Sequence, residues 1–578
     1  MSNKPALMFE DLSSEVIIQI LHFCKYSTIL RLAATCKVYH KLVTQSISLQ
    51  LHIELEANGL ELVKGSFARN ATYSVILDDL KRFRKAWLDL DLAKPIVRSV
   101  GKSHTLLWEL REGFYIQAFS QSGVRHADAL QFVPLDSETP NPPPLLFDFP
   151  FDQFTVDPGQ ELIALASRNL GLFTTIFIDL CSISTGRAHS LAQCPRLTAE
   201  FDFERPFFTL AIAIEIMGNV LLTSVSHPRL HTYELLIWDW RSGNVLSRIS
   251  SRQGICDFTF LDQQHLAIMS ATRTEPHLEV LRSLELLVYA LSDGTNSRSD
   301  NSGGQIQVAD IVASQPILRL AFPPIQESSK ISETAFFLQS DPTPGRIIYQ
   351  RSAAFACSYT HTLSMTFRLS RVNTGWESPD CYQVFLDGRS LLEQVCTSSS
   401  TTVPVPWASW GIGATRWFLT PRRPDYWNRL MSSSRFICRL SDQPYYCILD
   451  FSSTNANWFP GRTFKSHPAR LDQPEGANAI VSRRFEDLRE LDKEIYRRSA
   501  DWTPGHKLFV TAVGADSPST IIGPGFEEPI MSQLQYQIVC RMNHESDHQG
   551  WQINGDCVVG ISNMHHPTES LTIHRLRL

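Results

Sequence analysis

Apolar residues recur at helical spacing along the first ninety residues of the chain. Three short segments follow one another, and in each the apolar positions lie three or four residues apart, which predicts short amphipathic helices. The three stripes consist of Val16, Ile17, Ile20, Leu21 and Cys24, then of Ile29, Leu32, Ala33 and Cys36, and then of Val38, Tyr39, Leu42 and Val43. Ser13 or Ser14 is a candidate N-cap for the first helix, and Ser27 for the second. Two further helices are predicted, one over 49–60 that ends at a glycine and one within 70–92.

The pattern changes near Pro95. From about residue 103 onward, short β-like runs alternate with turns rich in Gly, Ser, Asp and Pro, which predicts a β-rich region. The candidate inner strands are 161–167, 219–226, 265–270, 335–340, 416–420, 507–513 and 557–562. In four other segments a strand is expected to run into a glycine turn, namely 176–189, 234–246, 285–296 and 382–392.

The turn glycines indicate a repeat. Gly186, Gly243 and Gly294 lie 57 and 51 residues apart. A degenerate repeat of roughly 40 to 55 residues with about four strands per unit is typical of a β-propeller. The segment 237–243 resembles the end of a WD repeat, where Asp239 and its neighbours either organise a tight turn or are surface residues without a special role. The predicted fold class is therefore multidomain, α plus all-β: a three-helix module and a helical connector, followed by a β-propeller of six to eight irregular, WD-like blades.

Polar tracts interrupt the β-rich region. Residues 134–144, 292–305 and 397–404 are predicted surface loops. A longer polar segment, 461–504, is expected to be a helical insertion, because Phe485, Leu488, Leu491 and Ile495 would line one side of a helix.

Composition limits the classes of partner. The chain has 578 residues, of which 43% are hydrophobic and 19% charged, which is ordinary for a folded protein with more than one domain. The net charge of −6 gives no support for binding to nucleic acid or to an anionic membrane. The twelve cysteines include no CxxC pair, and neither a signal peptide nor an apolar run of membrane-spanning length is visible. We therefore expect reduced core cysteines and a cytoplasmic or nuclear protein.

Catalytic motifs are not evident. No GxSxG, HExxH or complete GxGxxG is present, so we expect neither an enzyme nor a cofactor. Cys540, His544, His548 and Cys557 have a spacing that would suit a tetrahedral zinc site. The alternative is that they are core cysteines and loop histidines. The sequence favours that alternative, so no metal site is predicted.

Residues 11–43 resemble an F-box. The family pattern begins Leu-Pro-x-Glu-Ile/Leu and ends (Val/Ala)-Cys-Lys-x-Trp-x-x-Leu. The residues that fit are Leu12, Glu15, Val16, Ile20 and Leu21 in the first part and Ile29, Leu32, Ala33, Cys36, Lys37, Tyr39, Leu42 and Val43 in the rest. Ser13 replaces the usual proline and Tyr39 the frequent tryptophan. Residues 49–60, 82–87 and a Trp-rich stretch within 403–418 resemble F-box proteins of mushroom-forming fungi, whose C-terminal regions are β-rich.

The resemblance implies three regions along the chain with different roles. It implies an F-box over 5–50, a helical connector over 51–100 and a β-propeller-like domain over 101–578. The F-box would bind a Skp-family adaptor, and through it a cullin scaffold, while the β domain holds a protein client for ubiquitination. The implied adaptor-binding residues are Leu12, Glu15, Val16, Ile20, Leu21, Ile29, Leu32, Cys36, Tyr39 and Leu42.

Elementary packing supports a partner for this module. About forty residues bury too little apolar surface to offset chain entropy comfortably, so exposed apolar side chains would supply an interface. Two alternatives remain. The helices would simply pack on the β domain, or the chain would be an adaptor-bound scaffold that ubiquitinates nothing. A hydrolytic propeller is a third and weaker interpretation.

Overall fold

The fold is known from a computed structural model of the chain. It describes residues 12–101, 104–123, 126–136, 139–169, 174–202, 211–227, 230–274, 280–291, 305–372, 380–398, 403–420, 430–438, 445–452, 488–499, 508–514, 518–521, 525–542, 548–562 and 570–578. Gly294, Phe485 and His544 lie outside these ranges, as do parts of the predicted loops and most of the segment 461–504.

Five helices precede the β-rich part. They are α1 (Ser14–Leu21), α2 (Tyr26–Thr35), α3 (Lys37–Gln45), α4 (Ile47–Ala57) and α5 (Tyr73–Asp89). Ser13 is the N-cap of α1, as predicted, because its hydroxyl accepts from the Val16 amide. The expectation for Ser27 was wrong, because the N-cap of α2 is Lys25, two residues earlier, and Ser27 lies inside the first turn of the helix.

The first four helices share one small core, and α4 reaches beyond it. Ile17, Leu21, Ile29, Ala33 and Val43 are buried together, and Leu49 and Ile53 of α4 complete this cluster. The same helix turns Leu51 towards Leu60, Ile76, Leu77 and Leu80 in a second cluster. α4 therefore spans the boundary expected at residue 50 and links the module to the elements that follow it.

The β-rich part consists of small, mostly antiparallel sheets, and the described residues form nine of them. Four come first along the chain. They contain β3 (Thr105–Arg111), β4 (Phe114–Phe119), β5 (Ala127–Pro134) and β6 (Leu145–Phe151); β7 (Gln153–Asp157), β8 (Leu162–Arg168), β9 (Thr175–Ser182), β10 (Arg196–Glu200) and β18 (Gln305–Gln307); β11 (Ala211–Met217), β12 (Val220–His227), β13 (Thr232–Asp239) and β14 (Asn244–Ser251); and β15 (Gly254–Phe260), β16 (His265–Arg273), β17 (Leu281–Ala290) and β19 (Leu318–Ala321).

Three further sheets of four or five strands follow. They contain β20 (Ser329–Ile331), β21 (Phe337–Gln339), β24 (Thr362–Arg371), β25 (Asp380–Asp387) and β26 (Thr415–Thr420); β27 (Met431–Ser432), β28 (Arg435–Cys438), β29 (Tyr445–Asp450), β30 (Leu508–Val513) and β33 (Tyr536–Met542); and β2 (Ile96–Ser99), β34 (His548–Asn554), β35 (Cys557–Ser562) and β36 (Ser570–Arg575). Two minor sheets contain β1 (Leu60–Leu62), β22 (Ile347–Tyr349) and β23 (Ala354–Cys357), and β31 (Ser519–Ile521) and β32 (Ile530–Ser532).

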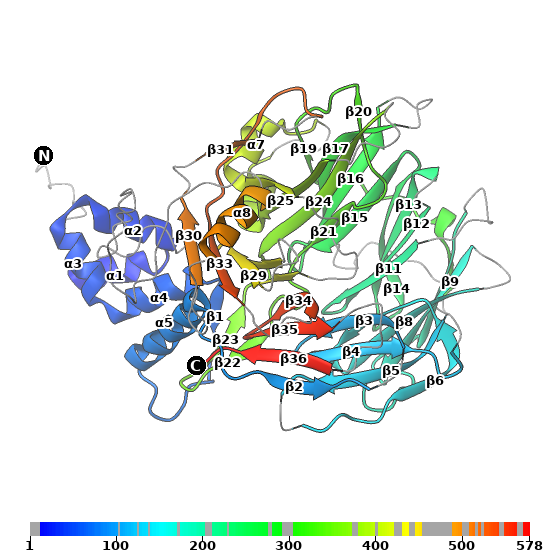
Figure 1. Cartoon of the computed structure of the whole chain (residues 1–578), viewed down its shortest axis with the longest axis horizontal. Helices are drawn as coiled ribbons and strands as arrows, with labels where there is room; N and C mark the ends of the chain where they lie inside the picture. The colour runs from blue at the N-terminus through cyan, green and yellow to red at the C-terminus, as the bar shows by residue number, and fades with distance from the viewer. Residues whose placement is uncertain are drawn as a thin grey trace, which may run out of the picture.

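The apolar core lies between successive sheets. Each of the seven larger sheets shares a buried hydrophobic cluster with the next one along the chain. The sheet of β34–β36 also shares a cluster with the sheet of β3–β6, through residues such as Val559, Leu571, Leu110 and Val133. Strand β2, which precedes β3, pairs with β36, and Ile96 lies opposite Ile573. Figure 1 shows these sheets following one another through the β-rich part of the molecule.

The predicted strands are present, with one error in a predicted turn. The segments 161–167, 219–226, 265–270 and 557–562 correspond to β8, β12, β16 and β35. Of the two alternatives for Asp239, the structure shows the tight turn: Asp239 accepts from Ser242 Oγ at 2.7 Å, and the Gly243 amide donates to the Asp239 carbonyl at 2.8 Å. The glycine turn expected within 382–392 was wrong, because α6 (Gly388–Thr397) begins there instead.

Two further helices cover the β-rich part. Helix α7 (Trp407–Ala414) precedes β26, and α8 (Leu488–Ser499) lies within the predicted insertion. Leu488, Leu491 and Ile495 of α8 are buried in the cluster that joins β25 and β26 to β28, β29 and β33. Their common face agrees with the predicted stripe. None of the helices within the described ranges combines the length and apolarity needed to cross a bilayer.

Candidate functional site

The helical module lies at the edge of the molecule, and one of its sides does not face the sheets. Figure 1 shows α1, α2 and α3 at one edge of the molecule, with α4 and α5 between them and the β-rich part. The positions predicted for adaptor binding are distributed over α1–α3 and their flanks, so their individual exposure decides which of them can touch a partner.

The predicted site residues fall into three groups. Leu21 and Ile29 are 3% and 0% exposed and belong to the core of the module, so they cannot contact a partner directly. Those that are partly buried and pack against this core are Leu12, Leu32, Tyr39 and Leu42. Those that are exposed are Glu15, Val16, Ile20 and Cys36.

Two strongly exposed apolar residues were missing from the predicted site. Phe23 is 93% exposed and Val38 is 70% exposed. A signal for Phe23 was available in the sequence, because it follows Val16 and Ile20 at seven and three positions, which is helical spacing, although in the structure it lies in the turn after α1. Val16 and Ile20 are themselves 40% and 39% exposed. We call Val16, Ile20 and Phe23 the α1 stripe.

The opposite side of the module is fixed to the β-rich part. The Arg84 guanidinium on α5 lies 2.6 Å from the Glu54 carboxylate on α4, and both side chains are buried. Asp79 of α5 accepts from the Ser352 amide at 3.0 Å. Strand β1 pairs with β23, with Leu60 opposite Cys357, so a strand that follows α4 is part of a sheet whose other two strands come from residues 347–357.

A polar cleft of about 460 Å³ lies at this junction. Its module side includes Lys25 and Glu56, and its β side includes Arg389, Glu393 and Asp450. These charges are largely paired across or within the cleft. Lys25 forms an ion pair with Glu393, and Arg389 donates to the Glu56 carbonyl at 3.1 Å. The cleft therefore contains the polar contacts that hold the module in place.

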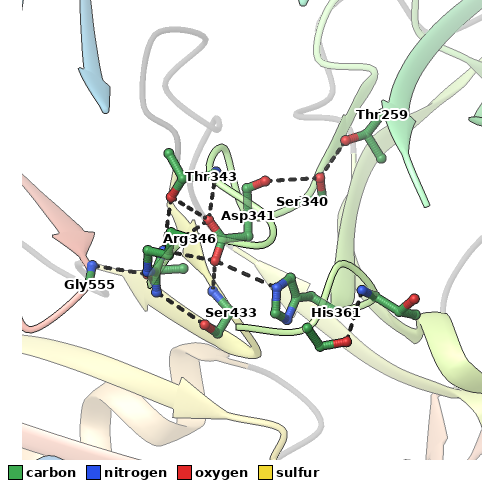
Figure 2. Close-up of polar contacts among 11 residues, drawn as sticks. Thr259, Ser340, Asp341, Thr343, Arg346, His361, Ser433 and Gly555 are labelled. Carbon is green, nitrogen blue, oxygen red and sulfur yellow. Dashed lines mark hydrogen bonds and ion pairs between the residues drawn. The ribbon is translucent and has the colours of Figure 1, made fainter. Parts of the chain in front are cut away.

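A buried polar cluster lies beside the cleft (Figure 2). The Asp341 carboxylate accepts from Arg346 at 3.0 Å, from the Thr343 amide at 2.8 Å and from the Ser433 amide at 2.5 Å. Arg346 also donates to Ser432 and Ser433 Oγ, both at 3.1 Å, which connects residues 341–346 to the turn after β27. His361 Nε2 lies 3.9 Å from Asp341 Oδ2.

Burial and charge shift the pKa values in this cluster. Burial alone would raise the pKa of Asp341, but Arg346, His361 and two backbone amides together hold it below its ordinary value. Burial lowers the pKa of His361 to about 4, and the Arg346 and Arg389 charges act in the same direction. His361 is therefore neutral at physiological pH, and its buried ring lies beside Asp341.

The residues whose spacing would suit zinc, of which Cys540, His548 and Cys557 lie in the part of the chain that the structure describes, are not gathered there into a metal site. Cys540 is buried on β33, and Cys557 is buried on β35 of a different sheet. The His548 ring packs at right angles on Trp551, with 5.2 Å between ring centroids. Among the described residues, no group of three or more His, Cys, Asp or Glu side chains is placed to hold a metal ion.

Comparison with known proteins identifies no family. No protein-family model and no curated protein matches the chain. Structural matches include Kuenenia stuttgartiensis hydrazine synthase, at 11% identity and a TM-score of 0.28, over 50% of this chain and 65% of that one. The uncharacterized protein lmo1340 from Listeria monocytogenes EGD-e matches at 9% identity and a TM-score of 0.22, over 51% of this chain and 95% of that one. Phage phi92 endosialidase matches at 9% identity and a TM-score of 0.22, over 85% of this chain and 70% of that one.

Proposed function

We propose that the chain is a substrate-recruiting subunit of a Skp–cullin–F-box ubiquitin ligase, in which the helical module binds a Skp-family adaptor and the β-rich part binds a protein client. The chain itself carries out no bond chemistry in this role. It holds the client so that its lysines lie near the conjugating enzyme, which is a proximity effect. Cytoplasm and nucleus are the compartments that suit this role.

The α1 stripe is the observation that carries the proposal. Val16 and Ile20 on α1 and Phe23 in the turn that follows α1 are exposed apolar side chains, Phe23 at 93%, and Val38 is a further exposed apolar residue on α3. Apolar groups gathered on the surface of a soluble protein mark an interaction site. The F-box resemblance of residues 11–43 supports a Skp-family adaptor, rather than a client, as the occupant.

We infer further that the seven larger sheets are the blades of a β-propeller. Two features support this arrangement. Successive sheets share buried clusters, including the pair formed by the sheets of β34–β36 and β3–β6. In addition, β2 adds an N-terminal strand to a sheet whose other three strands are close to residue 578. Propellers close their ring in this way, and the loops at one end of the blades would hold the client.

Exposed residues are the right targets for a test of adaptor binding. Leu32 and Leu42 pack partly against the core of the module, so an aspartate there would also destabilise the helices. The double variant Ile20→Asp/Phe23→Asp changes only exposed side chains. It should lose capture of a purified Skp-family adaptor in a pull-down, because two carboxylates would be placed in an apolar interface.

A matched variant controls for the added charge. Val312 is 89% exposed on the β-rich part, far along the chain from the module, and Val312→Asp should bind the adaptor like the parent protein. Full adaptor capture by the Ile20→Asp/Phe23→Asp variant, with unchanged circular dichroism, would refute the proposal. Co-purification of a cullin with the adaptor supports a ligase, and adaptor without cullin supports the scaffold interpretation.

A further inference from the structure

Three cysteines lie in a row across three neighbouring strands. Cys438 on β28 is directly opposite Cys447 on β29, and Cys447 is directly opposite Cys540 on β33. Residues opposite one another in a sheet project to the same face, because side chains alternate along each strand. All three thiols therefore face the same hydrophobic cluster, which also contains Phe385 and Phe418.

Access to the row differs from one end to the other. Cys447 and Cys540 are 0% exposed, and their thiols are hydrogen-bonded to each other. Cys438, at the other end of the row, is only partly buried. Burial raises the pKa of Cys447 well above its ordinary value, so its thiol rarely ionises and reacts slowly with an oxidant that reaches it.

The spacing of the row suits disulfides and excludes a three-thiolate metal site. Residues directly opposite in an antiparallel pair have Cα atoms about 4.5–5.5 Å apart, which falls inside the range of about 4.4–6.8 Å seen in disulfides. The Cα separation expected for each neighbouring pair is therefore compatible with a disulfide. Cys438 and Cys540 are separated by two strand spacings, about 9–10 Å, so three sulfur atoms in a line cannot surround one metal ion.

We propose that this row is an oxidation site, in which a peroxide enters at Cys438 and a disulfide is passed inward to join Cys447 and Cys540. The Cys438 thiol gives up its proton and attacks a peroxide oxygen, so that an S–O bond forms and the O–O bond breaks; the hydroxide that is released takes up this proton and leaves as water. Cys447 then gives up its proton and attacks the Cys438 sulfur, so that an S–S bond forms, the S–O bond breaks and a second water leaves.

The last step is a thiol–disulfide exchange. Cys540 attacks the Cys447 sulfur, the bond to Cys438 breaks, and Cys438 takes up the proton that Cys540 loses. In the sum, two thiols lose two electrons and two protons to the peroxide, which becomes two waters. The product joins two strands that are shielded from solvent and lie 93 positions apart in the sequence (540 − 447). It therefore resists both added reductant and unfolding.

Peptide mapping of the full chain tests this inference directly. Trypsin places the three cysteines on three different peptides, 436–439, 440–462 and 508–541, and each contains one cysteine. The folded chain is treated with hydrogen peroxide, alkylated with N-ethylmaleimide during denaturation and digested without reductant. The expected product is peptide 440–462 linked to 508–541, lighter than the two reduced peptides by two hydrogens. Absence of this link after the exposed Cys36 and Cys396 are fully oxidised would overturn the inference.

Single substitutions separate the steps of the relay. Cys540→Ser should accumulate a link between 436–439 and 440–462 instead, because the exchange partner is gone. Cys438→Ser should slow formation of the 440–462/508–541 link by about tenfold or more, because the accessible thiol is lost. An unchanged rate would exclude Cys438 as the entry point. Cys381→Ser is the control, since this buried cysteine on β25 faces Arg368 and Thr420 across the sheet and should leave the link unaffected.

Discussion

Nη1 of Arg84 lies 2.7 and 2.6 Å from the two carboxylate oxygens of Glu54, and both side chains are buried between α5 and α4. This pair connects the helix that completes the module core to the helix that packs on the sheets. Glu54→Ala should destabilise the junction by about 3–5 kcal/mol, because it leaves the guanidinium buried without its partner. Hydrogen exchange of the α4 and α5 amides would measure the loss.

The double variant Glu54→Leu/Arg84→Leu is the informative control for this pair. Replacing both partners by apolar residues removes the desolvation cost together with the attraction, so its amides should exchange close to the parent rate. If the double variant is as unstable as Glu54→Ala, the loss in Glu54→Ala is not due to an unpaired charge alone, and the ion pair itself stabilises the junction.

The pH dependence of stability should report His361. Its pKa is lowered by burial to about 4, whereas the same group in the unfolded chain has its ordinary value of 6.5. Between these values the unfolded chain binds the proton more strongly, so stability falls as the pH decreases from about 6.5 to about 4. Each pKa unit corresponds to about 1.4 kcal/mol, which gives a loss of about 3 kcal/mol from this group.

Denaturation series at several pH values would test the contribution of His361. His361→Gln should show a shallower decrease in the free energy of unfolding over that pH interval than the parent chain. His40→Gln, at an exposed position on α3, is the matched control and should keep the parent slope. Equal slopes for the parent and His361→Gln would show that the lowered pKa of His361 does not contribute to the pH dependence of the free energy of unfolding.

Gly388 marks a close approach between two backbones. A Cβ atom built on it would lie 2.3 Å from the His361 carbonyl oxygen, which also accepts from the Gly388 amide at 3.2 Å. Gly388→Ala should therefore lower the thermal midpoint, since the obstacle is backbone and not the end of a flexible side chain. Gly413→Ala, on an exposed position of α7 with nothing within 4 Å, should instead stabilise by about 0.5–1 kcal/mol. A similar effect of both changes would contradict the close approach.

Asp387 is expected to hold the start of α6. Its carboxylate accepts from the amides of Arg389 and Ser390, both at 3.3 Å, and from Ser390 Oγ at 2.7 Å. Asp387→Ala should cost about 1 kcal/mol, measured by chemical denaturation, because two amides lose their acceptor. Asp387→Asn keeps a capping oxygen and should cost much less. Equal losses would attribute the effect to charge in the neighbouring cleft and not to the cap.

Local pattern was enough to predict many elements. Helix α5 was expected within 70–92 and runs from Tyr73 to Asp89, because Thr72 caps it and its apolar residues share one side. Strand β35 has the bounds predicted from the apolar run at 557–562. In both cases the residues that decide the structure are neighbours in the sequence, so periodicity and capping contain the necessary information.

Helix α6 was missed because its glycine was interpreted as a turn, and α7 was not predicted. Asp387 and Gly388 after an apolar strand are typical of a turn, but the same aspartate serves equally well as an N-cap. Gly411 of α7 is buried against Trp407, whose ring lies 2.2 Å from the place a Cβ would occupy. A contact with the aromatic ring, not backbone freedom, explains that glycine, and such packing is not visible in a propensity pattern.

The candidate site was predicted as a region but not residue by residue. The predicted site includes Leu21 and omits Phe23, yet Leu21 is buried and Phe23 is exposed. Exposure depends on α4, whose Leu49 and Ile53 cover one side of the module. The sequence of the first forty residues does not contain that helix, so it cannot distinguish core residues from contact residues. The cysteine row was invisible for a related reason, because Cys540 meets Cys447 only through the register of distant strands.

The pairing of β2 with β36 has a consequence for the order in which the protein is made. Ile96 cannot pair until Ile573 has been synthesised, and Ile573 is added 477 positions later (573 − 96). At roughly 5–20 residues per second, β2 leaves the ribosome about half a minute or more before its partner strand exists. The helices α1–α4 have a core of their own and need no such wait. We therefore expect the nascent chain to present a formed helical end while the β-rich part is still open, which makes the strands around β2 natural clients of chaperones during synthesis.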